Sequence, residues 1–123
     1  MTRQHLSPRE EVLSRYANGE RSFMGEDFYG QLVDLRGVVL AGAHFSECFL
    51  NIDFRGADLT GCRFENGNVK CCDFRGARLE GASFKGSAID GAEFDQKGLL
   101  DADFEGAYEQ GYDYKKGEKP VRK

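Results

Sequence analysis

A five-residue rhythm from Ile52 to Phe94 constrains this chain more than any other feature. The stretch divides into the blocks IDFRG, ADLTG, CRFEN, GNVKC, CDFRG, ARLEG, ASFKG, SAIDG and AEFDQ. A small residue opens nearly every block, a Phe, Leu, Ile or Val stands at its centre, and Gly often closes it. Self-similarity at a fixed short period indicates a repeat architecture, whose units bury their apolar side chains only by stacking on one another.

The spacing within a block predicts which side chains face inward. In extended chain the opener and the centre lie two positions apart, so they point to the same side, which must be the interior. The polar residues beside the centre then point outward. The closing Gly and the next opener turn the corner, because Gly tolerates positive φ without a steric penalty. Helical spacing and sustained strict alternation both fail over this stretch.

The block centres sort into columns if four blocks make one coil, because positions twenty apart then stack. Phe columns alternate with aliphatic columns, although a period of two blocks would produce the same alternation. The predicted core centres are Phe54, Leu59, Phe64, Val69, Phe74, Leu79, Phe84, Ile89, Phe94, Leu99 and Phe104.

The rhythm is broken at three places, where we expect the backbone to bulge at a corner. Gln31 and Leu32 are two extra residues, and the block 48–51 is one residue short. We count this short block with Leu50 as its centre, rather than Phe49. Lys97 falls at an inward opener position, and we expect a bulge to release its ammonium to water, since burying it unpaired is costly.

This tandem pattern, roughly Ala-(Asp/Asn)-(Leu/Phe)-x-x over about residues 21–107, resembles the pentapeptide-repeat family. The resemblance implies an all-β fold: a right-handed, quadrilateral (four-sided) β-helix solenoid with one block on each side. The chain would then divide into an N-terminal tail and capping helix (1–20), the β-helix (21–107) and a C-terminal segment (108–123).

The two ends of the chain depart from the repeat. Residues 1–6 are predicted to fray, and an α-helix from about Pro8 to Asn18 is predicted to cover the open end of the solenoid. Ser7 can cap this helix and Glu10 completes a capping box. At the other end Tyr108, Tyr112 and Tyr114 either fold over the open coil or form a contact between two such ends. The residues from about Lys115 onward are predicted to be disordered.

Composition and motifs argue against several classes of function. The net charge is −4, and no apolar run is long enough for a membrane span. Three of the four Cys (48, 62 and 72) occupy small inward openers, where we expect buried, reduced thiols rather than a metal site. No phosphate loop, zinc motif or nucleophile elbow is present. We therefore expect a cytoplasmic, bacterial protein that is not an enzyme and has no catalytic residues, cofactor or metal.

The outward positions remain for function. One side carries an ordered series of charges, which we take as the candidate interaction face: Asp34, Arg36, Asp53, Arg55, Asp73, Arg75, Glu93 and Asp95. The alternative interpretation is a solvated face, in which each exposed pair contributes about 0–1 kcal/mol.

Two functions fit these features. The first is a non-enzymatic protein–protein interaction module or scaffold with an unidentified protein partner, as a monomer or an end-to-end dimer. The second comes from the resemblance, since some members mimic DNA and inhibit type II topoisomerases such as gyrase. An acidic rod could imitate the phosphate array that such enzymes bind. In this chain the acidic face is interrupted by three basic residues, Arg36, Arg55 and Arg75, which weakens the likeness to DNA.

Overall fold

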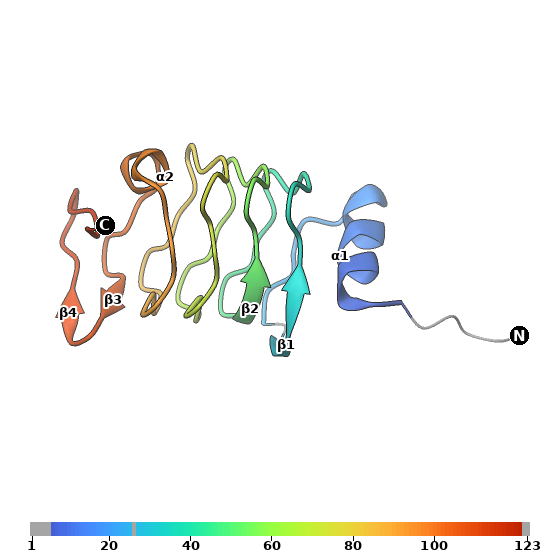
Figure 1. The fold of residues 1–123 in the computed structure, drawn as a ribbon, viewed down its shortest axis with the longest axis horizontal. Coiled ribbons are helices and arrows are strands. Elements are labelled where there is room, and N and C mark those ends of the chain that lie inside the picture. The colour runs from blue at the N-terminus through green and yellow to red at the C-terminus, as the bar shows by residue number, and fades with distance from the viewer. Residues whose placement is uncertain (1–5, 26, 122–123) are drawn as a thin grey trace, which may run out of the picture.

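The chain winds into a stack of coils with a helix beyond one end and a hairpin at the other (Figure 1). The computed structural model describes residues 6–25 and 27–121, so most of the predicted frayed terminus at 1–6 lies outside the described residues. The elements in chain order are α1 (Pro8–Ala17), β1 (Asp27–Asp34), β2 (Phe49–Asp53), α2 (Gln96–Asp101), β3 (Tyr108–Glu109) and β4 (Tyr112–Asp113).

Successive coils pair in parallel, and from Asp53 onward the paired residues are twenty apart in the sequence. β1 pairs with β2, and single bridges continue the pattern beyond them, for example from Asp53 to Asp73 and from Asp73 to Glu93. Each such bridge is backed by a backbone hydrogen bond, such as that from Phe54 N to Asp73 O at 2.8 Å. Residues twenty apart therefore lie side by side, which makes this region a parallel β-solenoid.

The bridges also locate the two register slips that the sequence predicts. Ser22 pairs with His44, a separation of 22 residues that accommodates two extra ones, and the β1–β2 register is irregular between Phe28 and Val33. His44 pairs with Arg63, a separation of 19 residues across the short block. Within that block Leu50 is fully buried while Phe49 is 56% exposed, so Leu50 is the centre.

The core is a set of stacked side chains running along the coils. All eleven predicted centres are buried, none more than 5% exposed. Phe54, Phe74 and Phe94 stack with ring centroids 5.2 and 5.0 Å apart. A second column consists of five stacked rings: Phe23, Phe45, Phe64, Phe84 and Phe104. The rings of the two columns contact each other edge to face, as Phe54 and Phe64 do. Both arrangements are favoured for aromatic pairs.

The corners explain the closing residue of each block. Gly56 and Gly76 have φ values of 70° and 74°, in the left-handed region that only Gly adopts without strain. The non-glycine residues Glu47, Asn66 and Cys71 close their blocks in the same conformation, with φ between 56° and 66°. The five-residue rhythm thus follows from a left-handed corner at the end of most blocks.

Helix α1 forms where the sequence predicts it. Ser7 and Glu10 make the reciprocal capping box, Pro8 is the first helical residue, and Asn18 follows the last. Val12 is buried in the core cluster. The Tyr16 hydroxyl donates to Ala41 O at 2.8 Å, which ties the helix to the neighbouring coil.

The break at Lys97 takes a form that we did not predict. The backbone forms the short helix α2 instead of a bulge, because the Asp95 carboxylate accepts a hydrogen bond from Gly98 N at 2.8 Å and caps its start. Leu99 stays in the core at 2% exposure. The Lys97 side chain is exposed, as expected, and pairs with Asp101 at 2.5 Å.

The C-terminal segment folds back onto the last coil, so the prediction of disorder from Lys115 is wrong as far as residue 121. Strands β3 and β4 pair antiparallel, and Tyr114 packs against the core. The Lys119 ammonium donates to Ala102 O, and Pro120 is buried. Basic residues thus have packing partners here that composition does not reveal. Residues 122–123 lie outside the described residues.

Candidate functional site: a charged ladder along one side

The Asp before each core centre on the charged side has a local structural role. Asp53 Oδ1 accepts a hydrogen bond from Arg55 N, two residues on, at 3.1 Å. This contact satisfies a backbone donor as the chain approaches the corner, a common use of Asp and Asn in turns. The same contact recurs in Asp34–Arg36, Asp58–Thr60, Asn68–Lys70, Asp73–Arg75 and Asp103–Glu105.

Three of these Asp residues also hold the side chain of the following Arg. Arg55 Nε donates to Asp53 Oδ1 at 3.0 Å, and Arg55 Nη2 donates to Asp53 Oδ2 at 2.8 Å. Such two-point contacts match the planar guanidinium to the planar carboxylate. The pairs Asp34–Arg36 and Asp73–Arg75 have the same geometry, with distances of 2.6–2.9 Å.

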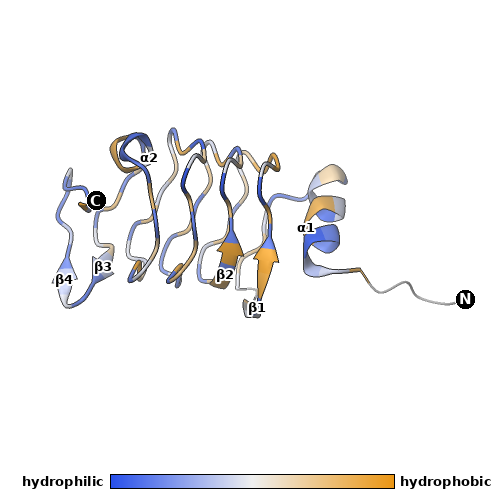
Figure 2. Ribbon diagram, viewed as in Figure 1, coloured by the Kyte–Doolittle hydropathy of each residue, from blue (hydrophilic) through white to orange (hydrophobic). Residues whose placement is uncertain are grey.

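The pairs join into one continuous series along the coils. Arg36 Nε lies 3.9 Å from Asp53 Oδ2, and Arg55 Nε lies 3.7 Å from Asp73 Oδ2. Figure 2 shows the hydrophilic stretches that follow β1 and β2 on this side. The series starts with Arg9 of α1, 3.7 Å from Asp34, and ends with Glu93, 3.1 Å from Arg75. We call it the Asp/Arg ladder: Arg9, Asp34, Arg36, Asp53, Arg55, Asp73, Arg75 and Glu93.

The two kinds of side chain are not equally accessible. The side chains of Asp53 and Asp73 are only 13% and 20% exposed, whereas those of Arg36, Arg55 and Arg75 are 46–56% exposed. In the middle of the ladder, therefore, arginines form the outer layer and the carboxylates lie beneath them.

The ladder holds its charges across a wide pH range. Hydrogen bonds from the Arg55 side chain lower the pKa of Asp53 below its usual value, and those from Arg75 do the same to Asp73. The pKa of Asp34 is also lowered, chiefly by the Arg36 side chain. A carboxylate stabilised in its ionised form does not donate a proton as a general acid near neutral pH.

Asp95, which the sequence placed on the same face, has a different environment. Its Oδ2 accepts a hydrogen bond from Gly76 N at 2.8 Å, and its Oδ1 caps α2. The carboxylate thus bonds to backbone donors and joins no arginine of the ladder. The signal was present in the sequence, because Gly98 follows Asp95 by three residues, the spacing of a helix cap.

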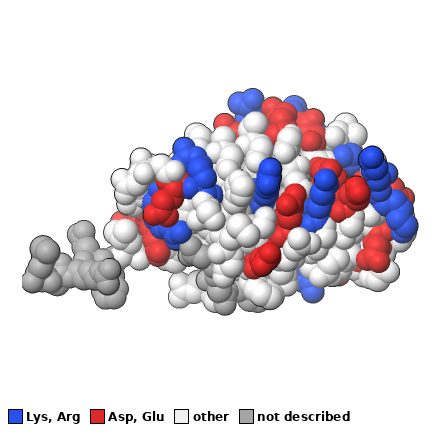
Figure 3. All heavy atoms as spheres, turned by 180° about the vertical axis from the view of Figure 1, so that it is seen from behind, with Lys and Arg blue, Asp and Glu red and all other residues white. Residues whose placement is uncertain are grey.

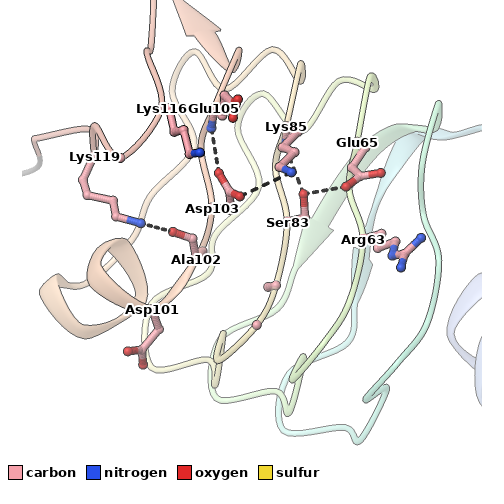
Figure 4. A pocket seen from close by; sticks show the side chains of 13 residues that line it. Arg63, Glu65, Ser83, Lys85, Asp101, Ala102, Asp103, Glu105, Lys116 and Lys119 are labelled. Carbon is pink, nitrogen blue, oxygen red and sulfur yellow. Dashed lines mark hydrogen bonds and ion pairs between the residues drawn. The ribbon is translucent and has the colours of Figure 1, made fainter.

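A groove that sequence reasoning missed lies between another side of the solenoid and the C-terminal segment (Figure 4). Its volume is about 780 Å³. It was missed because one of its edges is made by Lys116, Gly117 and Lys119, which were expected to be disordered. Many of its charges are already satisfied, since Lys85 pairs with Asp103 at 3.6 Å and Ser83 Oγ donates to Glu65 at 2.6 Å.

The buried thiols carry no reactive geometry. Cys48 and Cys62 donate from Sγ to the carbonyls of Phe23 and Leu40, and burial raises the pKa of Cys62 to about 12. In residues 6–25 and 27–121, no three His, Cys, Asp or Glu side chains gather as a metal ion would require. Neither helix in that part of the chain is long and apolar enough to cross a bilayer.

Solved structures offer only distant similarities. A pentapeptide repeat protein from the thylakoid lumen of Arabidopsis thaliana is 17% identical, with 77% of this chain and 73% of that one aligned and a TM-score of 0.38. Full-length QnrB1, a plasmid-mediated fluoroquinolone resistance protein, is 17% identical over 70% and 83% of the two chains, with a TM-score of 0.24.

HetL, a pentapeptide repeat protein involved in heterocyst differentiation regulation in the cyanobacterium Nostoc, is 17% identical over 89% and 100%, with a TM-score of 0.21. Because every one of these scores is below 0.5, the assignment to a family rests on the repeat itself. The search of curated proteins finds no match.

The repeat match is direct. The family model for pentapeptide repeats, in 8 copies, matches residues 32–70 and 57–96, together more than half of the chain. These are the blocks whose centres stack in the core and whose flanks build the ladder. The resemblance seen in the sequence is confirmed: the chain belongs to the pentapeptide-repeat family.

Proposed function

We propose that this chain is a non-enzymatic protein–protein interaction module that presents the Asp/Arg ladder to another protein. In this proposal the solenoid is a right-handed, four-sided β-helix, and helix α1 caps its N-terminal end. Support for four sides comes from bridges twenty residues apart with a block centre at every fifth position. Support for the cap comes from the buried Val12 and from the packing of Leu13 and Tyr16 on the core.

The observation that carries the proposal is the continuity of the ladder. Its pairs repeat with nearly the same geometry in three consecutive coils and connect between coils. An array held in register by the backbone is rigid, so a partner that binds it loses little side-chain entropy there. In the part of the chain that the structure describes, apolar side chains form the interior of the solenoid, which supports a function carried by its outer surface.

The experiment is affinity capture from an extract of the source organism, with wild-type protein and a ladder variant as baits. The variant carries Asp53→Asn, Arg55→Glu, Asp73→Asn and Arg75→Glu. Asn keeps an acceptor for the turn, as Asn68 does with Lys70 N at 2.9 Å, so the fold should be preserved. Thermal unfolding by circular dichroism checks this for each bait.

A partner captured by wild type and lost by the ladder variant supports the proposal. The matched control is Arg78→Glu, which changes the net charge by the same amount on another side of the solenoid. Retention by the ladder variant together with loss by the control would assign binding to another surface and leave the ladder as a solvated face.

DNA mimicry, the second function considered from the sequence, finds less support in these features. The ladder is neutral in sum, since four basic residues alternate with four acidic ones. On the face seen in Figure 3, acidic and basic side chains are interspersed and form no continuous acidic surface. We expect no inhibition in a gyrase supercoiling assay, and inhibition that persists in the ladder variant would favour mimicry by another surface.

We further propose a monomer that acts in the cytoplasm. Tyr114 packs against the core and Pro120 is buried, which supports an end that is less available to a second copy. Light scattering should give the chain mass of 13.7 kDa, and twice that mass would indicate the end-to-end dimer. Fractionation of source cells tests the location.

A further inference from the structure

We propose that the partner of the ladder offers a column of carboxylates to Arg36, Arg55 and Arg75, and that this column runs across neighbouring strands of a β-sheet. The inference rests on the proposed function and adds the chemistry of the partner. It follows from which side chains of the ladder are exposed and which of their donors are still available.

The arginines are the groups that a partner meets first. The carboxylates of Asp53 and Asp73 lie beneath them, and each already accepts a backbone N–H and two side-chain N–H groups. A partner with basic groups would have to displace those contacts. The ladder therefore favours an acidic partner over a basic one.

The arginines retain donors for such a partner. A guanidinium has five N–H groups, and Nε and Nη2 supply those that bind the ladder's own Asp. Among the described residues, no hydrogen bond involves Nη1 of Arg36, Arg55 or Arg75. Each Arg is thus fixed in place by its Asp and still presents N–H donors to solvent, an arrangement suited to binding carboxylates.

Spacing selects the kind of surface. The three arginines stand on consecutive coils, which lie about 4.8 Å apart, as neighbouring strands do. Carboxylates on adjacent strands of a sheet repeat at this same distance and can meet the arginines one to one. Side chains on one face of a single strand repeat at about 6.6–6.8 Å, and side chains four residues apart on a helix repeat at about 6 Å. Neither repeat matches the spacing of the arginines.

The test uses a probe of defined geometry, made from this chain. The probe carries Asp34→Asn, Arg36→Glu, Asp53→Asn, Arg55→Glu, Asp73→Asn and Arg75→Glu, which places one Glu on each coil. A second probe with the four changes at positions 53, 55, 73 and 75 serves if the first does not fold. Binding to wild type is measured by calorimetry at low and high salt. A helical peptide with Glu at every fourth position is the comparison ligand.

We expect wild type to bind the folded probe one to one, more weakly at high salt, and more tightly than it binds the helical peptide. Replacing Arg36, Arg55 and Arg75 by Gln in wild type should weaken binding by about tenfold or more. Replacing Asp53 and Asp73 by Asn should change it much less. Absence of binding to the probe, or equal binding of the Gln variant or the helical peptide, would overturn the inference.

The capture experiment separates this inference from the proposed function. A native partner that is lost with Asp53→Asn and Asp73→Asn but kept with the three Arg→Gln changes would leave the ladder as the interaction surface. It would show that the carboxylates, and not the arginines, are recognised, and the inference alone would be overturned.

Discussion

Gly67 provides a sharp test of how the coils stack. Most blocks open with Ala, Cys, Ser or Val, yet this one opens with Gly, although its φ is not in the left-handed region. Its neighbour on the preceding coil is Cys48, which opens the short block 48–51. A Cβ at position 67 would lie 2.7 Å from Cys48 O and 3.0 Å from Cys48 N. Those atoms belong to the backbone and cannot rotate away.

The cost of Gly67→Ala can be worked out from this contact. Relief of the overlap requires a shift of the chain at Cys48, whose O accepts a hydrogen bond from Asn68 N at 2.9 Å. Overpacking of this kind costs about 1–3 kcal/mol. The lower entropy of the unfolded Ala chain offsets about 0.4–1 kcal/mol. We therefore expect a net loss of about 1–2 kcal/mol, or a Tm lower by about 3–10 °C.

Urea unfolding followed by circular dichroism measures this loss. Gly30→Ala is the matched control, because its added Cβ would meet nothing within 4 Å, and its stability should change by less than about 0.5 kcal/mol. If Gly67→Ala were as stable as the control variant, the close approach of the two coils at Cys48 would be wrong.

Three further predictions concern the ladder, the thiols and the C-terminal segment. Because the pKa values of Asp53 and Asp73 are lowered in the fold, the stability they contribute is present above the usual Asp pKa and lost as the pH falls. The double Asp→Asn variant should thus lose less stability than wild type between about pH 5 and pH 2, measured by urea unfolding. Under native conditions Cys71, the exposed thiol, should react with Ellman's reagent first, and the buried thiols should react only on unfolding. Lys119→Met should lower stability by about 0.5–1.5 kcal/mol in thermal unfolding through loss of the hydrogen bond to Ala102 O, while exposed Lys116→Met should leave it unchanged.

Much of the core could be predicted because its signal is a repeat. Many blocks together define each column of stacked centres, so one irregular block does not obscure the pattern. The columns therefore predict Leu50, and not Phe49, as the centre of the short block 48–51. The helix at Pro8 was predictable for a different reason, since Ser7 and Glu10 form a local capping box that needs no tertiary information.

The features that were missed depend on contacts between distant segments. Disorder was predicted from Lys115 because the tail is basic and lacks apolar runs. In the structure the Lys119 ammonium finds Ala102 O, which composition cannot indicate. The ladder was predicted as a set of outward charges. That the Asp residues accept turn hydrogen bonds and lie beneath the arginines depends on side-chain geometry, which the block pattern leaves open.

The central claim is that residues twenty apart are paired on neighbouring parallel coils around one filled core, with backbone hydrogen bonds between residues nineteen apart, which leaves the outer sides for binding. Scalar couplings across hydrogen bonds, measured by NMR on isotope-labelled protein, test it most directly. The account predicts couplings from the amide nitrogens of Phe54, Phe64 and Phe74 to the carbonyl carbons of Asp73, Ser83 and Glu93, respectively. Couplings from these amides to residues of an adjacent block, in the pattern of antiparallel hairpins, would contradict it.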